Sequence, residues 1–241
     1  MDRRHTSSQW PRGDTPRVMS EPRFFSLDYL EHATLRNGTS VHIRLVTPED
    51  KELLRTGFER LSPESRYARF LAPKASLSDD ELRYLCALDQ EQHFAIGAIR
   101  DADGGESVGL GIARFIRLAD LPHTAEAAIA VADEVQHQGL GTLLFLRLVA
   151  AAAERGIERF RCEVLATNAS MVALIAQIDP ERSIEVGEGV LSIEATLPVI
   201  APTQPPTEES RQNPLYQLLR AAAENAVEWT DAVRKLWRRS P

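Results

Sequence analysis

The feature that most constrains this chain is a junction between a strand and a long apolar helix, with two glycines at the helix start. The strand pattern ends near Val131, and Gly139 and Gly141 stand where the helix begins. The first backbone N–H groups of a helix lack partners inside it, and the helix dipole makes that end positive. Glycines there let a phosphate approach the backbone closely. The junction is a candidate anion site, although a tight turn that merely requires glycine would give the same pattern.

Two common phosphate-binding loops do not fit these residues. A P-loop requires Lys and then Ser or Thr after its last glycine, whereas Gly141 is followed by Thr142 and Leu143. A dinucleotide-binding fingerprint requires a third glycine three positions after the second, where this chain has Leu144. The sequence therefore argues against both classes of nucleotide-binding protein.

Composition indicates an ordinary globular chain. The 241 residues, 43% of them hydrophobic, suffice for one domain of about 150–200 residues with tails. A net charge of −7 argues against a general nucleic-acid binder. No transmembrane run and no apolar secretory signal stand in the sequence, so we expect a cytoplasmic protein. Cys86 and Cys162 are too few for a disulfide framework or a metal site, and we expect buried thiols.

The order of periodic segments predicts a mixed α/β (α+β) fold, in which a mostly antiparallel sheet carries helices on both faces. Strands are expected over residues 39–46, 93–100, 106–117, 125–131, 160–164 and 189–197. Helices are expected to begin at Thr47, Ser62, Ser78, Gly139 and Asn168.

The two ends of the chain differ from this central domain. Residues 1–22 are interpreted as a flexible arm, 23–200 as the folded domain and 201–214 as a proline-rich linker. Residues 215–239 predict an amphipathic helix with a basic end. It could pack on its own domain, join subunits of a homo-oligomer or lie on an anionic surface, and we favour the first two.

The glycine segment and its neighbours resemble the coenzyme A site of the GNAT acetyltransferase superfamily. Gln136-x-x-Gly139-x-Gly141 is similar to that family's Gln/Arg-x-x-Gly-x-Gly/Ala motif. Asn168 resembles the family's asparagine at the head of the next helix, and the similarity spans about residues 38 to 197. The resemblance implies a GNAT-type fold, acetyl-CoA as the cosubstrate, and direct attack of an amine on the thioester.

The same resemblance implies which residues bind the coenzyme. Backbone groups of Ile129 and Val131 would pair with the pantetheine arm like an added strand. Asn168 would contact the coenzyme farther along. The pyrophosphate would bind the amides of one segment, Gln136, His137, Gln138, Gly139, Leu140, Gly141 and Thr142. No metal ion is expected.

A closer resemblance lies in the N-terminal half. Residues 58–70, together with Asp89 and His93, are similar to the acetyltransferase domain of bacterial protein lysine acetyltransferases that modify acetyl-CoA synthetase. Those proteins usually carry an extra regulatory domain, for which this chain leaves no room. Arg66, Tyr67 and Arg69 would line the acceptor side, or would simply pack and face solvent. The acceptor stays open between a protein lysine and a small-molecule amine.

Glu126 is the candidate general base. An alkylammonium group has an ordinary pKa near 10.4 and must lose a proton before it attacks. Glu126 precedes Val131 by five residues and matches the glutamate base of the lysine acetyltransferase relatives. The alternative is a solvated carboxylate on the polar face of a strand. Glu163, His93 and His123 are weaker candidates.

The general acid has no clear candidate. Many GNAT enzymes place a tyrosine in the helix after the asparagine, and this chain has none there. Solvent or Tyr67 could serve instead. This gap leaves open a non-catalytic acyl-CoA-binding or sensing module, and an interaction protein organised around the C-terminal helix is a third possibility.

Overall fold

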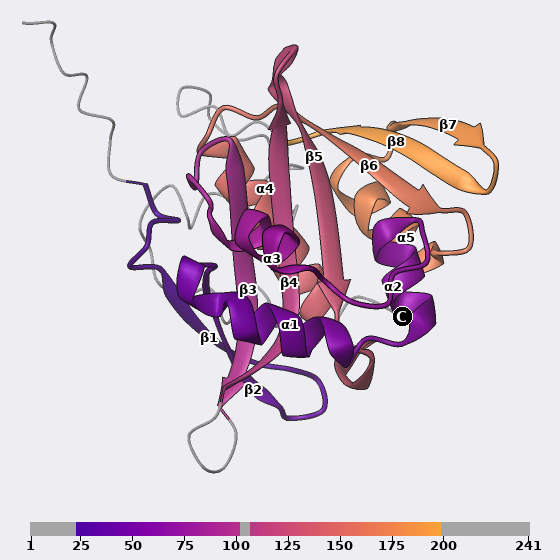
Figure 1. Cartoon of the computed structure of the whole chain (residues 1–241). Coiled ribbons are helices and arrows are strands. Elements are labelled where there is room, and N and C mark those ends of the chain that lie inside the picture. The colour runs from indigo at the N-terminus through magenta and orange to yellow at the C-terminus, as the bar shows by residue number, and fades with distance from the viewer. Residues whose placement is uncertain (1–22, 102–106, 199–241) are drawn as a thin grey trace, which may run out of the picture.

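The computed structural model describes residues 23–101 and 107–198, which form one eight-stranded sheet with helices on both faces (Figure 1). The strand order is β1-β2-β3-β4-β5-β6-β8-β7, and only the pair β5 and β6 is parallel. This arrangement confirms the predicted fold class. The arm 1–22, the linker 201–214 and the helix 215–239 lie outside the described residues.

The strands are β1 (Leu30–Thr34), β2 (Ser40–Leu45), β3 (His93–Asp101), β4 (Ser107–Leu118), β5 (Leu121–Val131), β6 (Arg159–Leu165), β7 (Ser183–Gly187) and β8 (Val190–Thr196). The helices are α1 (Lys51–Glu59), α2 (Pro63–Phe70), α3 (Asp79–Cys86), α4 (Leu140–Ala153) and α5 (Ala169–Ile178), with single 3₁₀ turns η1 (Pro48–Asp50) and η2 (Asp133–Val135). The sequence did not predict the edge strands β1 and β7. β7, with the sequence Ser-Ile-Glu-Val-Gly, is only five residues long and every one of them is exposed, so its short polar–apolar alternation does not mark a buried face.

Short polar signals set the helix starts as predicted. The Ser62 hydroxyl accepts a hydrogen bond from the Ser65 amide and caps α2. Ser78 and Glu81 form a capping box that opens α3. At the far end of α4, Gly156 adopts a φ of +70°, which favours glycine and ends the helix.

The sheet separates two apolar clusters. The smaller cluster lies under α1–α3, on the face toward the viewer in Figure 1, and contains Phe58, Leu61, Leu77 and Leu82. The larger cluster lies under α4 and α5 on the other face and includes stacked Phe94 and Phe115. Both cysteines are buried as expected, and burial raises the pKa of Cys162 to about 12, so it is not a reactive thiolate.

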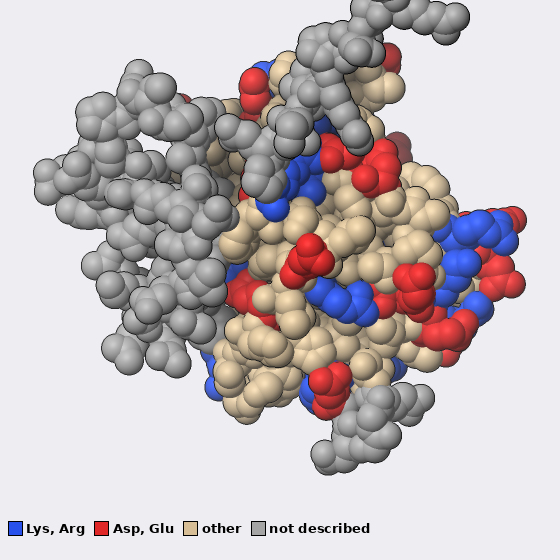
Figure 2. All heavy atoms as spheres, turned by 90° about the vertical axis from the view of Figure 1, so that its left-hand side faces the viewer, with Lys and Arg blue, Asp and Glu red and all other residues tan. Residues whose placement is uncertain are grey.

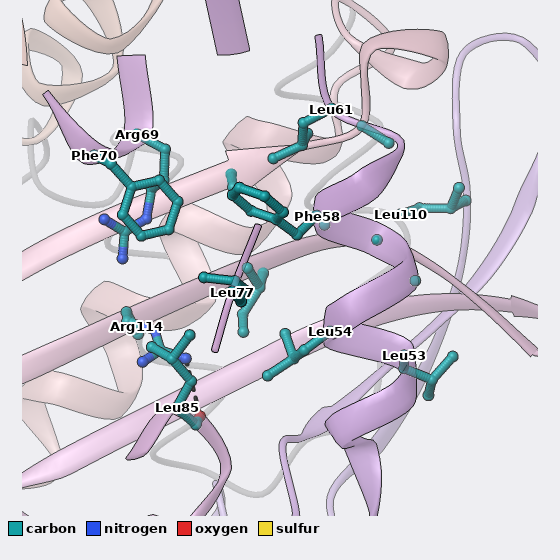
Figure 3. Close-up of a pocket in the computed structure, with 16 residues that line it drawn as sticks. Leu53, Leu54, Phe58, Leu61, Arg69, Phe70, Leu77, Leu85, Leu110 and Arg114 are labelled. Carbon is teal, nitrogen blue, oxygen red and sulfur yellow. Dashed lines mark hydrogen bonds between the residues drawn. The ribbon is translucent and has the colours of Figure 1, made fainter. Parts of the chain in front are cut away.

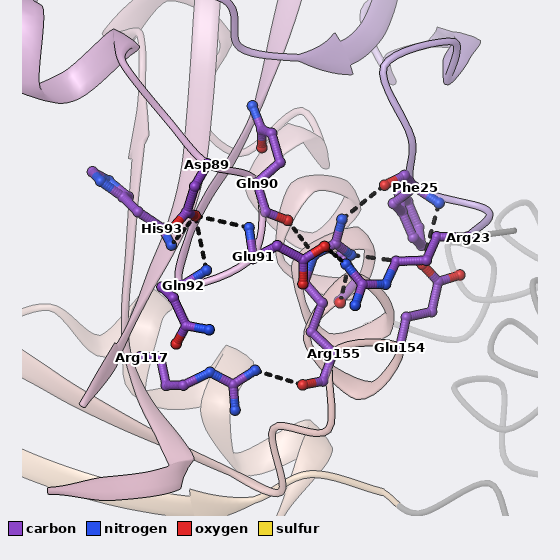
Figure 4. A network of polar contacts seen from close by, with 11 residues as sticks. Arg23, Phe25, Asp89, Gln90, Glu91, Gln92, His93, Arg117, Glu154 and Arg155 are labelled. Carbon is purple, nitrogen blue, oxygen red and sulfur yellow. Dashed lines mark hydrogen bonds and ion pairs between the residues drawn. The ribbon is translucent and has the colours of Figure 1, made fainter. Parts of the chain in front are cut away.

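Arg155 ties the start of the described chain and the loop before β3 to the end of α4 (Figure 4). Its guanidinium donates to the carbonyl oxygens of Gln90 at 2.6 Å and Phe25 at 2.8 Å. It also lies 4.2 Å from the centre of the Phe94 ring. Burial lowers the pKa of Arg155 to about 10, and these acceptors satisfy the buried charge.

Basic and acidic side chains lie beside one another on the face shown in Figure 2, with neutral residues between them. That face presents no extended area of a single charge. None of the helices in residues 23–101 and 107–198 is long and apolar enough to cross a membrane.

Gly111 allows α4 to pack closely on β4. A Cβ atom at this position would lie 2.9 Å from Leu144 Cδ1 and 3.2 Å from Leu140 Cδ2. Both leucines are fully buried, so any shift of their methyl groups takes place inside the packed core. The predicted strand–helix packing therefore depends on a glycine that periodicity alone does not identify.

We expect Gly111→Ala to lower the free energy of unfolding by about 1–3 kcal/mol, because the added methyl group overpacks the interface. Urea unfolding measures this change. Gly97→Ala is the matched control in the neighbouring strand, since its Cβ would make ordinary contacts at 3.6 Å to Val46 and 3.8 Å to Gly111. Equal losses for both variants would contradict the close-packing role.

Candidate active site

The strands β5 and β6 run together for only three residue pairs and then separate. The pairs join Thr124, Ala125 and Glu126 to residues 159–161. Beyond this point β5 continues to Val131 beside β4, whereas β6 remains paired with β8 and diverges from β5 (Figure 1). The edge of β5 over residues 127–131 therefore has no strand beside it in the described part of the chain. An open strand edge can pair with an extended chain that carries amide groups.

The start of α4 lies beside the end of this open edge. Leu143 donates the first internal hydrogen bond of the helix, to the Gly139 carbonyl at 3.0 Å. The amides of Leu140, Gly141 and Thr142 precede that bond and can donate to a ligand. Gly139 has a φ of +91°, so the sharp entry into the helix requires glycine. The geometry fits an anion at this end of α4.

Gly141 marks how close this helix start comes to the open edge. A Cβ atom there would lie 3.7 Å from Val131 Cγ2 and 3.9 Å from Leu174 Cδ1. The start of α4 therefore meets both the end of β5 and the side of α5. The predicted pyrophosphate and pantetheine residues are brought together at one place.

Gln136 holds the loop before α4 in position. Its side-chain amide donates to Ser65 Oγ at 3.1 Å and to the Val131 carbonyl at 3.3 Å. Its backbone amide donates to the Asp133 carbonyl at 3.3 Å. Gln136 thus links the loop to α2 and β5, and its own amide is already used within η2. It acts here as a positioning residue.

Asp133 is the second tether between this loop and α2. Its carboxylate accepts hydrogen bonds from the Ser62 amide at 2.9 Å, Ser62 Oγ at 2.8 Å and Ser65 Oγ at 2.7 Å. Burial opposes ionisation of this carboxyl group, but these hydrogen bonds outweigh burial and lower its pKa. The start of α2 and the loop before α4 therefore form one connected unit, which the sequence did not indicate.

Asn168 caps α5. Its Oδ1 accepts a hydrogen bond from the Met171 amide at 3.1 Å. The remaining end of the side chain, Nδ2, can only donate hydrogen bonds. Any contact with a ligand by the Asn168 side chain in this conformation is therefore through a donor to an acceptor oxygen or nitrogen.

Glu126 stands at the point where the strands part. It is opposite Ile116 on β4 and Arg161 on β6, and it is the last residue of β5 with a partner on β6. Its side chain is exposed. Ala130 lies on the same face of β5 and packs against the cluster under α1–α3, so Glu126 faces that side of the sheet. Glu163 lies beyond the divergence and accepts a hydrogen bond from Ser192 Oγ at 2.7 Å.

His93 serves the fold rather than proton transfer. The Asp89 carboxylate accepts hydrogen bonds from the amides of Glu91, Gln92 and His93, which fixes the start of β3 (Figure 4). The ring Nε2 lies 3.1 Å from an Arg114 guanidinium nitrogen. Burial and the charge of Arg114 lower the pKa of His93 to about 4. The ring is neutral at pH 7, and its Nε2 accepts a hydrogen bond from the Arg114 guanidinium. His123 instead contacts the Gly156 carbonyl at 3.0 Å.

The arginines of α2 have different roles. The Arg66 guanidinium donates to three backbone carbonyls, those of Leu61, Ala75 and Glu59. It therefore holds α1, α2 and the next loop together. Tyr67 is 43% exposed and available to a substrate. Arg69 lines a cavity. Its role on the acceptor side stays a prediction.

This cavity, of about 90 Å³, lies between α1–α3 and the strands β4 and β5 (Figure 3). Its walls are mostly apolar side chains such as Leu54, Phe58 and Leu77, and Arg114 lies in it with Arg69. The sequence alone did not indicate Arg114, which is only 4% exposed. The one signal was a charged residue inside the apolar run Gly-Ile-Ala-Arg-Phe-Ile.

We expect the stability of the protein to fall as the pH drops from about 6.5 to 4, partly because of His93. The unfolded histidine binds a proton near pH 6.5 and the folded one near 4, so the unfolded state holds more protons in this window. Discounted for partial exposure, the loss is about 1–2 kcal/mol. Urea unfolding at several pH values should show a smaller loss for His93→Gln, which still accepts from Arg114. Identical pH slopes would contradict this assignment.

The comparisons with known proteins agree with this geometry. The model of the Acetyltransferase (GNAT) family matches residues 54–178. The acetyltransferase PA5475 of Pseudomonas aeruginosa is 31% identical over 159 residues, which cover 64% of this chain and 84% of that protein.

Solved structures give the same result. The GNAT domain of PAT from S. lividans is 29% identical, with a TM-score of 0.61, over 70% of this chain and 97% of that one. The structure of yncA from Salmonella typhimurium with its cofactor acetyl-CoA shares the fold at 17% identity, with a TM-score of 0.52, over 68% of this chain and 98% of that one. The open edge of β5 and the free amides of α4 fit an extended pantetheine arm and its pyrophosphate. The chain belongs to the GNAT acetyltransferase family and is an acyltransferase that uses acetyl-CoA.

Proposed function

We propose that the protein transfers an acetyl group from acetyl-CoA to the amino group of an acceptor, with Glu126 as general base. The observation that carries this proposal is the position of Glu126 at the last pair before β5 and β6 separate. A carboxylate there lies at the mouth of the opening between the strands and on the face that carries α1–α3. An amine entering from that face meets the carboxylate beside the place where a thioester would lie.

The residues that would hold the coenzyme follow from the same opening. Backbone groups of Ile129 and Val131 on the open edge would pair with the pantetheine arm. The amides of the segment Leu140 to Thr142 would donate to the pyrophosphate, and Asn168 Nδ2 would contact the coenzyme farther along. When bound, acetyl-CoA supplies an acetyl carbon activated by its thioester.

The other residues of the predicted pyrophosphate segment shape it. His137 adopts a φ of +59° and Gly139 one of +91°, which together turn the chain into α4. The Gln138 carbonyl accepts a hydrogen bond from the Arg36 amide at 3.2 Å, so the turn between β1 and β2 supports the loop. We assign His137, Gln138 and Gln136 to positioning of the amides that follow.

Glu126 would take a proton from the acceptor ammonium, directly or through one water, so that the free amine attacks. Its neighbour Arg161 pairs with Glu194 at 3.3 Å, which occupies that guanidinium with another carboxylate. Helix α5, which the structure describes in full, contains no tyrosine. We therefore assign protonation of the leaving thiolate to solvent, with the exposed Tyr67 hydroxyl as the alternative donor.

The acceptor is either a protein lysine or a small-molecule amine. The similarity to the GNAT domain of PAT supports the first, and the mostly apolar cavity on the face of the sheet that carries Glu126 supports the second. A non-catalytic acyl-CoA-binding module is the alternative function, favoured by the absence of a tyrosine from α5. Cytoplasmic location and assembly through the helix 215–239 stay predictions.

We expect Glu126→Gln to lower kcat by about 10²–10³-fold with little change in the affinity for acetyl-CoA, because only proton removal is lost. Thiol release with amine and protein acceptors measures kcat, and calorimetry measures affinity. Glu163→Gln, on the neighbouring strand, is the matched control and should retain activity within about twofold. Acetyl-CoA binding without turnover on any acceptor would favour the sensing module.

We expect Gly139→Ala to weaken acetyl-CoA binding about tenfold or more, since a side chain at this φ distorts the amides that follow. Gly156→Ala at the other end of α4 meets similar backbone strain at a φ of +70°, with no atom within 4 Å of its added Cβ. Both variants should lose about 1–2 kcal/mol of stability. Only Gly139→Ala should lose affinity in calorimetry. Equal affinities would remove the start of α4 from the coenzyme site.

A further inference from the structure

Two arginines share one end of the cavity under α1–α3. Arg69 comes from α2 and Arg114 from β4, and in Figure 3 both lie at the end away from Leu53 and Leu110. The remainder of the lining is almost entirely apolar. A cavity with two cationic groups at one end and hydrocarbon along the rest has the polarity of a site for an amphipathic anion.

No carboxylate within residues 23–101 and 107–198 pairs with either guanidinium. Arg114 donates to the Leu85 carbonyl at 3.0 Å and meets the neutral His93 ring, while Arg69 lies 4.9 Å from the centre of the Phe70 ring. The Arg69 guanidinium makes no hydrogen bond to the described chain. Burial lowers the pKa of Arg69. The pKa of Arg114 is lowered to about 10, mainly by burial and to a smaller extent by the charge of Arg69.

Buried Arg147 and half-buried Arg44 behave differently. Arg147 forms two hydrogen bonds to the Glu31 carboxylate, at 2.6 and 2.9 Å. Arg44 binds the Asp50 carboxylate at 2.6 and 2.7 Å. Where this fold buries an arginine for stability, it provides a carboxylate or several carbonyl acceptors. Buried Arg114 and half-buried Arg69 therefore form a pair of cations in one cavity without a carboxylate partner in the described part of the chain.

The sheet register places this pair next to the proposed base. Arg114 is opposite Ala128 and Glu126 is opposite Ile116, so Arg114 and Glu126 are diagonal neighbours on the same face. Such neighbours are about 7–8 Å apart. This separation lets one small molecule place a carboxylate at the arginines and an amine near Glu126.

We propose, on the basis of the function proposed above, that the acceptor is a small hydrophobic α-amino acid. Its carboxylate binds between Arg69 and Arg114, its apolar side chain enters the cavity, and its amino group faces Glu126. The amine nitrogen bonds to the acetyl carbon while the carbon–sulfur bond breaks. The ammonium proton passes to Glu126 and then to solvent before the attack, and a second N–H proton leaves to solvent as the amide forms. The departing sulfur keeps the electron pair of the broken bond and takes one proton from solvent.

The same charges disfavour a protein lysine at this position. A lysine side chain brings an ammonium group and no carboxylate beside it, so it would meet two uncompensated guanidinium groups. An α-amino acid neutralises them, and guanidinium groups bind carboxylates with well-defined geometry. The cavity of about 90 Å³ has room for a short aliphatic side chain.

The first test measures binding without chemistry. The probe is 4-methylpentanoate, which has a carboxylate and a branched aliphatic chain but no amine, and its control is 4-methylpentanamide. We expect calorimetry on the full chain to show binding of the acid at least about tenfold tighter than the amide. Arg69→Gln should abolish this preference and Arg69→Lys should retain part of it. Arg69 is chosen because Arg114 also supports the fold through Leu85 and His93.

The matched control is Arg83→Gln on α3, whose side chain is 62% exposed and pairs with Asp80. It should bind the acid like the unaltered protein. Equal binding of acid and amide by the unaltered protein, or an unchanged preference in Arg69→Gln, would overturn the anion site.

The second test separates this inference from the proposed function. With saturating acetyl-CoA, we expect kcat/KM for L-leucine to exceed that for L-leucinamide by about 10–100-fold, and Arg69→Gln to remove the difference. Turnover of a lysine peptide but not of L-leucine would sink the amino-acid acceptor and leave the acetyltransferase intact. Binding of 4-methylpentanoate with no turnover of any acceptor would keep the anion site and overturn both the catalytic proposal and the role of this site in it.

Discussion

The site depends on where β5 stops pairing with β6. Each strand is committed elsewhere, β5 to β4 through Val131 and β6 to β8 through Leu165, so the two share only three pairs before they diverge. The proposed roles of the site residues follow from their positions relative to the point where the two strands diverge. Glu126 lies at it, the open edge of β5 follows it, and the start of α4 lies at the far end of the opening. Because both strands are held by continuous ladders on their other sides, the opening belongs to the fold and does not have to form when a ligand arrives.

A second constraint couples the two halves of the site. Asp133 and Gln136, in the loop before α4, are hydrogen-bonded to Ser62 and Ser65 at the start of α2. The helix that carries Arg69 is thus fixed to the loop that leads into the proposed pyrophosphate amides. A displacement of one would strain the other, so acceptor and coenzyme positions are linked through a few short hydrogen bonds.

Local patterns accounted for most of the elements. The capping residues Ser62 and Ser78 predicted α2 and α3, and the apolar repeat predicted α4. These predictions hold because helix capping hydrogen bonds and side-chain periodicity depend only on residues close in sequence. The edge strands β1 and β7 were not predicted, because an edge strand can form without a strong apolar alternation in its sequence. Arg114 also escaped, since one arginine in an apolar strand is ambiguous until its neighbours across the sheet are known. Arg69 was predicted with two readings, and only the cavity distinguishes it from the structural Arg66.

The sequence by itself indicated the family and the coenzyme, through the resemblance of Gln136, Gly139 and Gly141 to the GNAT coenzyme A motif. Such a motif can be recognised without the fold because its glycines serve the backbone of a single helix start. The sequence also named Glu126 as the candidate base. The tertiary structure decided what those residues surround. It placed Glu126 where β5 and β6 diverge. It gave Gln136 and His93 structural hydrogen bonds, and it placed Arg69 and Arg114 in the same cavity. These outcomes depend on strand register and on uncompensated charge, which arise only when residues distant in the chain become neighbours.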